Sequence, residues 1–185
     1  VMGLTALIAL RHQTIAGILA TAFFVRASAA LFHFYVAPLP DGGTDAVTFQ
    51  ALAWEWGQDG VFEALSYFPG LNTYTHTWLM SLLYALTDRS LLMLQASSVL
   101  AGVLGVFYTW RLAAEIWSYS VARRAAWIMV FFPSVVQYGA LPMREAWVVL
   151  FFLMAQVYVV RWGRNSQMKP LLAAILLFSV GAFFH

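Results

Sequence analysis

The sequence predicts an all-α fold, a polytopic bundle of about five transmembrane helices with two interfacial helices in a large first outer loop. Hydrophobic residues make up 62% of the 185 residues and charged residues only 10%, and the mean hydropathy is +0.76. Soluble domains contain roughly 45–50% apolar and about 25% charged residues, so this composition indicates an integral membrane protein. The chain has no cysteine, which excludes disulfides and thiolate metal sites.

Five apolar segments are candidates for the spans. A membrane-spanning helix needs about 20 apolar residues, or somewhat fewer where its flanks reach the interface. The segments are residues 16–36, 91–110, 125–141, 146–160 and 170–184. Residues 78–86 are apolar but too few to cross. Because the chain begins and ends inside apolar runs, we expect residues 1–185 to form one transmembrane domain, the N-terminal portion of a longer protein.

The distribution of basic residues orients the bundle. With five spans and a cytoplasmic N-terminus, most basic side chains outside the spans face the cytoplasm, and only Arg89 and Arg144 lie outside. Counting residues 78–86 as a sixth span would reverse most of this bias, so the positive-inside rule favours five spans. The cytoplasmic basic residues are then Arg11, Arg111, Arg123, Arg124, Arg161, Arg164 and Lys169.

The orientation makes residues 37–90 a large outer loop that contains most of the acidic residues. Thr44 is the expected N-cap of a helix that starts at Asp45, where a carboxylate is favourable beside exposed N–H groups. Ala46, Phe49, Ala53 and Trp56 share one face of that helix at helical spacing. A second helix is expected over residues 74–86, and both helices suit the boundary between lipid and water.

Two carboxylates of this loop are candidate catalytic groups. Asp45 is the first residue of the predicted helix, so the helix fixes its direction. Asp41 precedes Gly42 and Gly43, and we expect it to be held less firmly. Each also has a purely structural interpretation, because aspartate favours both helix starts and turns. Spacing alone leaves both interpretations open.

Four further polar positions need an explanation. A mid-span arginine is unfavourable by roughly 2.5–3.5 kcal/mol on insertion scales, so Arg26 should face the bundle interior or an aqueous cavity. Arg144 and Glu145 lie at the outer end of the fourth span, where they can form either a site or a simple ion pair. His76 stands among polar residues and can equally lie at a polar interface.

The outer residues resemble a known family pattern. An acid after the first span, an aromatic four positions on and an alanine eight positions on appear here as Asp45, Phe49 and Ala53, and "FPSVVQYGALPMREAW" follows at residues 132–147. The sequence is similar to the N-terminal portion of GT-C superfamily glycosyltransferases, in particular bacterial relatives of protein O-mannosyltransferases and aminoarabinose transferases. The resemblance covers residues 16–185.

The resemblance implies specific roles. The first-loop acid would act as general base or orient the acceptor, which places that role on Asp45 with Asp41 as the competing choice. Arg144 and Glu145 fall where such enzymes place further polar groups. Tyr74 matches the tyrosine that opens the second interfacial helix, although the accompanying prolines are absent. Arg26 and His76 complete the predicted substrate-binding set, and no metal ligand is assigned.

The predicted function is transfer of a sugar from a polyprenyl-phosphate donor to a lipid, glycan or protein acceptor. It would occur at the outer face of a bacterial inner (plasma) membrane, with membrane lipids as further partners and no nucleic acid. The need for a divalent ion is left open. A lipid or solute transporter is the alternative, with Arg26, Asp45 and Glu145 on its path. A polysaccharide polymerase or ligase of another fold is a second rival.

Overall fold

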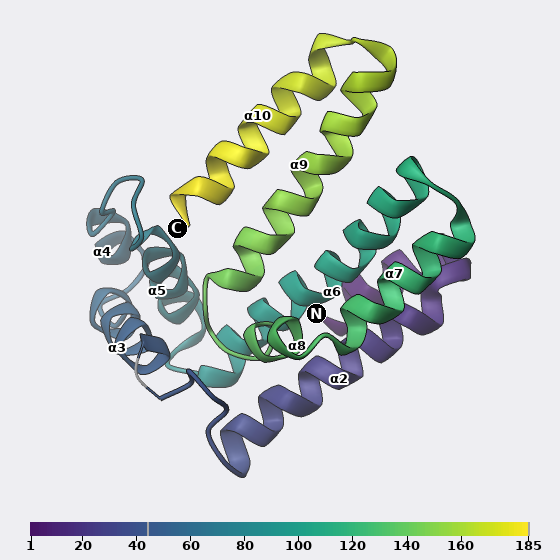
Figure 1. Ribbon diagram of the computed structural model, residues 1–185. Helices are drawn as coiled ribbons and strands as arrows, with labels where there is room; N and C mark the ends of the chain where they lie inside the picture. Colours follow the sequence, from purple (N-terminus) through teal and green to yellow (C-terminus); the bar gives the residue numbers. More distant parts are fainter. Residues whose placement is uncertain (44, 185) are drawn as a thin grey trace.

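The computed structural model describes residues 1–43 and 45–184, and within these residues all regular structure is helical (Figure 1). The predicted all-α class is therefore confirmed. In chain order the helices are α1 (Met2–Arg11), the short 3₁₀ helix η1 (Gln13–Ile15), α2 (Ala16–Tyr35), α3 (Asp45–Gly57), α4 (Val61–Ser66), α5 (Thr75–Thr87), α6 (Leu91–Ile116), α7 (Tyr119–Phe131), α8 (Pro133–Tyr138), α9 (Glu145–Asn165) and α10 (Met168–Phe183).

Three segments are long and apolar enough to cross a membrane: Gln13–Tyr35, Leu91–Ile116 and Glu145–Asn165. They correspond to the first, second and fourth spans expected from the sequence. α10 matches the fifth expected span but has only 16 residues, and α1 is a further short apolar helix. The protein is thus a helical membrane bundle in which span-length helices and shorter apolar helices alternate.

The third expected span, residues 125–141, is wrong as one continuous helix. α7 starts earlier, at Tyr119, and ends at Phe131, and the six-residue α8 starts at Pro133. Proline has no N–H to continue the ladder, and it drives the preceding residue out of the helical region. Phe132 accordingly adopts φ −64° and ψ 117°. The chain therefore breaks here and α8 takes a separate direction.

α6 lies at the centre of the bundle and packs against α2, α7 and α9, while α9 and α10 run side by side as a hairpin (Figure 1). The main core joins α2, α6 and α7. Its buried members include Leu19, Ala22, Val103, Val106 and Val130. Small residues on α2 and α7 let the helices approach α6 closely, as is usual where association in lipid depends on packing.

Arg26 lies inside this core and is fully buried, as a mid-span arginine should be. Its guanidinium donates to the carbonyl oxygens of Met129 at 3.0 Å and Val130 at 3.4 Å, in the last turn of α7. Carbonyls at a helix end lack intrahelical partners, and Pro133 removes one donor that would have reached Met129. Arg26 therefore supplies hydrogen-bond donors to the free carbonyl groups at the C-terminal end of α7. Gly102 makes room for it, because a Cβ there would lie 2.6 Å from the Arg26 Nε.

The loop over residues 37–90 is folded and contains three helices. α3 begins at Asp45 as predicted, and α5 covers almost the same residues as the predicted second helix. The short α4 between them was not predicted. α3 and α5 pack together through Ala53, Met80 and Tyr84. The proposed cap residue, Thr44, lies outside the described residues.

Candidate active site

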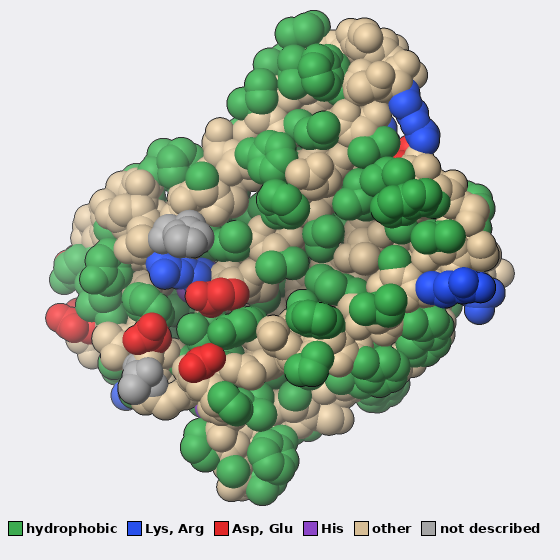
Figure 2. All heavy atoms as spheres, viewed as in Figure 1, with side chains coloured by type: hydrophobic (Ala, Val, Ile, Leu, Met, Phe, Trp, Pro, Cys, Tyr) green, Lys and Arg blue, Asp and Glu red, His purple; other side chains and the backbone are tan. Residues whose placement is uncertain are grey.

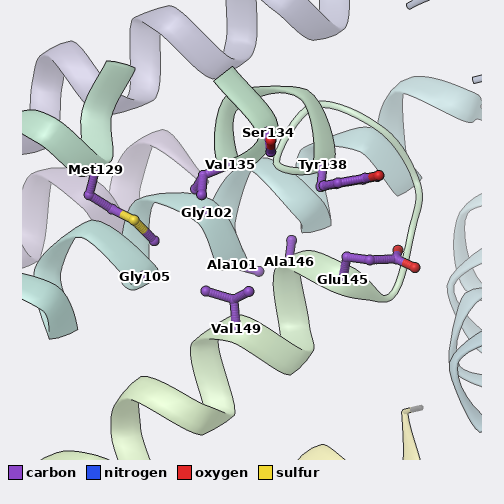
Figure 3. A pocket seen from close by; sticks show the side chains of 10 residues that line it. All are labelled: Ala101, Gly102, Gly105, Met129, Ser134, Val135, Tyr138, Glu145, Ala146 and Val149. Carbon is purple, nitrogen blue, oxygen red and sulfur yellow. The ribbon is translucent and has the colours of Figure 1, made fainter. Parts of the chain in front are cut away.

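An apolar cavity of about 290 Å³ lies between α6, α7, α8 and α9 (Figure 3). The glycines and alanines of α6 and α9 leave the space that larger side chains would fill. Tyr138 from α8 and Glu145 from α9 line one end, and their side chains extend in the same direction, with the hydroxyl and the carboxylate pointing away from the other lining residues (Figure 3). The remaining lining residues are Ala101, Gly102, Gly105, Met129, Ser134, Val135, Ala146 and Val149.

Asp41 is hydrogen-bonded to two side chains of α8, the helix that contributes Tyr138 to one end of this cavity. Its Oδ2 accepts hydrogen bonds from the Tyr138 hydroxyl and from Gln137 Nε2, each at 3.1 Å. The Tyr138 phenol is therefore the donor in this contact. The expectation that Asp41 is loosely held is wrong, because side chains about 96 residues further along the chain hold its carboxylate.

Arg144 and Glu145 form the start of α9, with the Arg144 Nε 3.7 Å from a Glu145 carboxylate oxygen. The other oxygen, Oε2, is buried and has no hydrogen-bond partner in the described part of the chain. The Arg144 guanidinium also lies 5.9 Å from the ring centre of Phe49 on α3. An aromatic face stabilises a nearby cation, so Phe49 helps to hold Arg144 at the boundary between the loop helices and the bundle.

Asp45 is exposed at the first position of α3. The next residue, Ala46, is buried against Leu141 and Met143, which immediately precede Arg144. The first turn of α3 therefore lies against the segment that leads into α9. Acidic side chains gather around a basic one on this face, between α3 and α8 (Figure 2).

Tyr74 and His76 lie at the start of α5. The Tyr74 ring is 6.4 Å from that of Phe49, which brings it to the same cluster as Arg144. His76 is 5% exposed and lines a separate small pocket with Trp147 and Phe184. Burial, with a smaller contribution from the positive charge of Arg144, lowers the pKa of His76 to about 4. The imidazole is therefore neutral at pH 7.

The structure thus brings together most of the predicted site residues. Glu145 lines the cavity and Asp41 is hydrogen-bonded to Tyr138, which also lines it. Arg144 and Tyr74 meet at Phe49, and Asp45 begins the helix that packs beside them. Arg26 is not part of this group, since it is enclosed in the core and donates to main-chain carbonyls. Within residues 1–43 and 45–184, no group of three or more His, Asp or Glu is placed to hold a metal ion.

Gln137 and Tyr138 were missed as site residues. Both stand in the stretch at residues 132–147 that carries part of the family resemblance, so a signal was present. Their role depends on α8 turning back toward the first loop, which follows from the break at Pro133. Sequence periodicity does not give the direction of a helix after such a break.

The family model described as dolichyl-phosphate-mannose-protein mannosyltransferase matches residues 72–184, more than half of the chain. The chain belongs to this family. No curated protein and no solved structure matches it. Membership implies membrane glycosyltransferase activity, with a lipid-linked sugar donor and an acceptor in general terms.

The match to the mannosyltransferase family includes the site residues of the bundle but not the two aspartates of the first loop. Tyr138, Arg144 and Glu145 lie within residues 72–184, as do α6 to α9, which form the cavity. Asp41 and Asp45 precede residue 72. Their connection to the matched region is the packing described above: Asp41 through α8, and α3 through Leu141 and Met143.

Proposed function

We propose that the protein transfers a sugar from a polyprenyl-phosphate donor to the hydroxyl of a lipid, glycan or protein acceptor, at the outer face of a bacterial inner membrane. One observation carries the proposal: Tyr138 and Glu145 line one end of an apolar cavity, and the Tyr138 hydroxyl donates a hydrogen bond to the first-loop acid Asp41. A lipid-linked sugar likewise combines an apolar part, the prenyl chain, with polar parts, the charged phosphate and the sugar.

The apolar part of the cavity suits a segment of the prenyl chain. Its walls come from helices that lie in the bilayer, so the chain can enter from the lipid without crossing water. Arg144 would stabilise the phosphate as negative charge develops on the leaving oxygen. Phe49 on one side and Glu145 on the other hold Arg144 at this position.

Asp45 is proposed as the general base, with Asp41 as the competing residue. In the reaction the acceptor oxygen forms a bond to the anomeric carbon, and the bond from that carbon to the phosphate oxygen breaks. The acceptor proton passes to the carboxylate, and the electron pair leaves with the polyprenyl phosphate. Asp45 is exposed at a helix start, where it can meet a hydroxyl from the aqueous side. Asp41 already accepts hydrogen bonds from two protein donors.

The experiment compares Asp45→Asn and Asp41→Asn for sugar transfer from a polyprenyl-phosphate donor in liposomes. General-base catalysis contributes typically 10²–10⁴-fold, so Asp45→Asn should lower turnover by about that factor with normal donor binding. Glu55→Gln is the matched control, since Glu55 is exposed further along the same helix. Wild-type turnover in Asp45→Asn with loss in Asp41→Asn would transfer the role to Asp41. Full activity in both would contradict the proposed site.

The transporter alternative places Arg26 on a substrate path. Its guanidinium is enclosed and two of its nitrogens donate to main-chain carbonyls, so this setting does not favour transport.

A further inference from the structure

The turn that carries Asp41 has an unusual backbone. Residues 39–42 form a β-turn closed by a hydrogen bond of 3.0 Å from the Gly42 N–H to the Leu39 carbonyl, with Pro40 at the second position. Asp41 occupies the third position with φ 61°. A positive φ at this position normally selects glycine, and a non-glycine residue there is uncommon. The aspartate is therefore held in a conformation that its own preferences do not favour, as is frequent at functional sites.

His33, in the last turn of α2, holds this turn from one side. Its Nδ1 accepts a hydrogen bond of 3.0 Å from the Leu39 N–H. The imidazole also lies directly against Gly42, where an added Cβ would be 2.5 Å from the His33 Cε1. The backbone of Gly42 has no positive φ, so glycine is required at this position by the close contact with His33 and not by the backbone conformation.

α8 holds the same turn from the other side. Gln137 Nε2 donates to the Pro40 carbonyl at 2.9 Å and to the Asp41 carboxylate at 3.1 Å, and Tyr138 donates to that carboxylate. The turn is thus clamped between the end of α2 and a short helix whose Tyr138 lines the cavity. Loss of the α2 contact would leave the turn held by these α8 side chains and by the packing of Leu39.

We propose that His33 is a positioning residue of the transferase: its unprotonated Nδ1 and its packing against Gly42 fix the turn that aims Asp41 at Tyr138 and leads into α3. The inference rests on the proposed function in taking Asp41 and Asp45 as part of the site. His33 acts through the backbone of residues 39–42 and has no contact with the cavity.

Three substitutions at His33 separate the hydrogen bond from side-chain bulk. Asparagine places its Oδ1 close to the position of the imidazole Nδ1 and should retain most of the transfer activity. Glutamine moves the acceptor outward, and leucine removes it. Because small misplacements of a catalytic group are costly, His33→Gln and His33→Leu should lower kcat by about 10- to 100-fold with little change in KM for the donor.

A double-mutant cycle with Gly42 tests the contact itself. Gly42→Ala should lower kcat, because its Cβ meets the His33 Cε1. His33→Asn lacks that atom, so the double variant His33→Asn/Gly42→Ala should recover activity relative to Gly42→Ala alone. Recovery should be partial, since the Cβ also lies 3.0 Å from the Leu39 carbonyl oxygen. Gly43→Ala is the matched control and should be neutral, as nothing lies within 4 Å of its Cβ.

A second readout does not depend on the reaction. A cysteine in place of Gly43, in the otherwise cysteine-free chain, should react with a water-soluble maleimide several-fold faster when His33 is leucine than when it is histidine or asparagine. Equal labelling in all three backgrounds, full activity of His33→Leu, or no recovery in the double variant would overturn the positioning role. Absence of transfer in the unsubstituted protein would contradict the proposed function instead, and the labelling rates would still test His33.

Discussion

The carboxylates of Glu115 and Asp41, at opposite ends of the bundle, have different partners: basic side chains at Glu115 and neutral donors at Asp41. At the end formed by the α6 and α9 C-termini, Glu115 accepts hydrogen bonds from Arg161 Nε at 2.9 Å and Nη2 at 2.6 Å. Arg164 also contacts the Glu115 carboxylate and donates to its carbonyl. At the opposite end, neutral donors from α8 meet the Asp41 carboxylate, and one Glu145 oxygen is buried without a hydrogen-bond partner in the described chain.

On the proposed function, the charges at the first end serve the fold and the carboxylates at the opposite end serve the reaction. The Glu115 cluster joins two long helices with opposite charges at hydrogen-bond distance, an arrangement that stabilises the bundle. A buried carboxylate oxygen without a partner costs stability, so its retention needs another reason. On the proposed function, that reason at Glu145 is the adjacent cavity, where the carboxylate would meet a substrate group.

The largest expected effect concerns which end of the bundle faces outside the cell and which faces the cytoplasm. We expect a cysteine at Gln58 to be labelled from outside by a membrane-impermeant reagent, and a cysteine at Ser166 only after permeabilisation. The reason is the basic bias of the end that contains Arg161, Arg164 and Lys169. The effect should be all-or-none. The reverse pattern would place the carboxylate cluster in the cytoplasm and contradict the proposed outer-face reaction.

Matched glutamine substitutions at the two ends should have opposite consequences. Glu145→Gln removes a charge at the cavity, and transfer should fall by about 10²-fold, as is typical when an electrostatic contact to a reacting group is lost. Its melting temperature in detergent should change little, because the Glu145 side chain is 36% exposed. Glu115→Gln should lower the free energy of unfolding by about 1–2 kcal/mol while leaving the turnover of folded protein unchanged.

Both quantities must be measured on both variants, because either alone is ambiguous. A loss of turnover in Glu115→Gln at full folding would show that the basic end also contributes to the reaction. A large drop in melting temperature with Glu145→Gln would show that this carboxylate is structural. Glu63→Gln, on the exposed surface of α4, is a suitable control for both measurements.

Arg26 extends the comparison to a buried charge whose hydrogen bonds are made to main-chain carbonyls of the core. Arg26→Leu should preserve membrane insertion, since a mid-span charge is removed. The folded bundle should nevertheless lose about 2–3 kcal/mol, because the Met129 and Val130 carbonyls lose their donor. Thermal unfolding in detergent measures this, with Thr21→Ala on the exposed face of α2 as the control. Unchanged melting in Arg26→Leu would show that the arginine is dispensable to the end of α7.

Composition and hydropathy were sufficient to predict the class of fold and the positions of the long helices, because burial in lipid requires long apolar segments. The Asp45 start of α3 was predictable for a local reason, the preference of carboxylates for helix starts. The break at Pro133 was missed because the apolar run continues through it. Proline interrupts a helix, but hydropathy, which set the expected span, does not respond to proline.

The sequence led to individual candidate residues for the site but not to the contacts between them. Asp41, Glu145 and Arg144 were identified from loop position and family spacing. The hydrogen bonds from Gln137 and Tyr138 to Asp41, and from Leu39 to His33, join segments whose approach depends on tertiary packing. The turn at residues 39–42 was expected from Asp41 and the following glycines, whereas the contact of Gly42 with His33 is visible only in three dimensions.

The break at Pro133 also sets the depth at which the reaction would take place. α7 has 13 residues and, at 1.5 Å per residue, rises about 20 Å, which is less than the hydrocarbon thickness of about 30 Å. In the five-span orientation, a helix that starts at the cytoplasmic surface therefore ends well before the outer surface, and α8 lies in the remaining depth. On the proposed function, Tyr138 at the end of α8 would then lie below the outer surface of the hydrocarbon, so the donor phosphate and the acceptor would both have to reach inward to meet it.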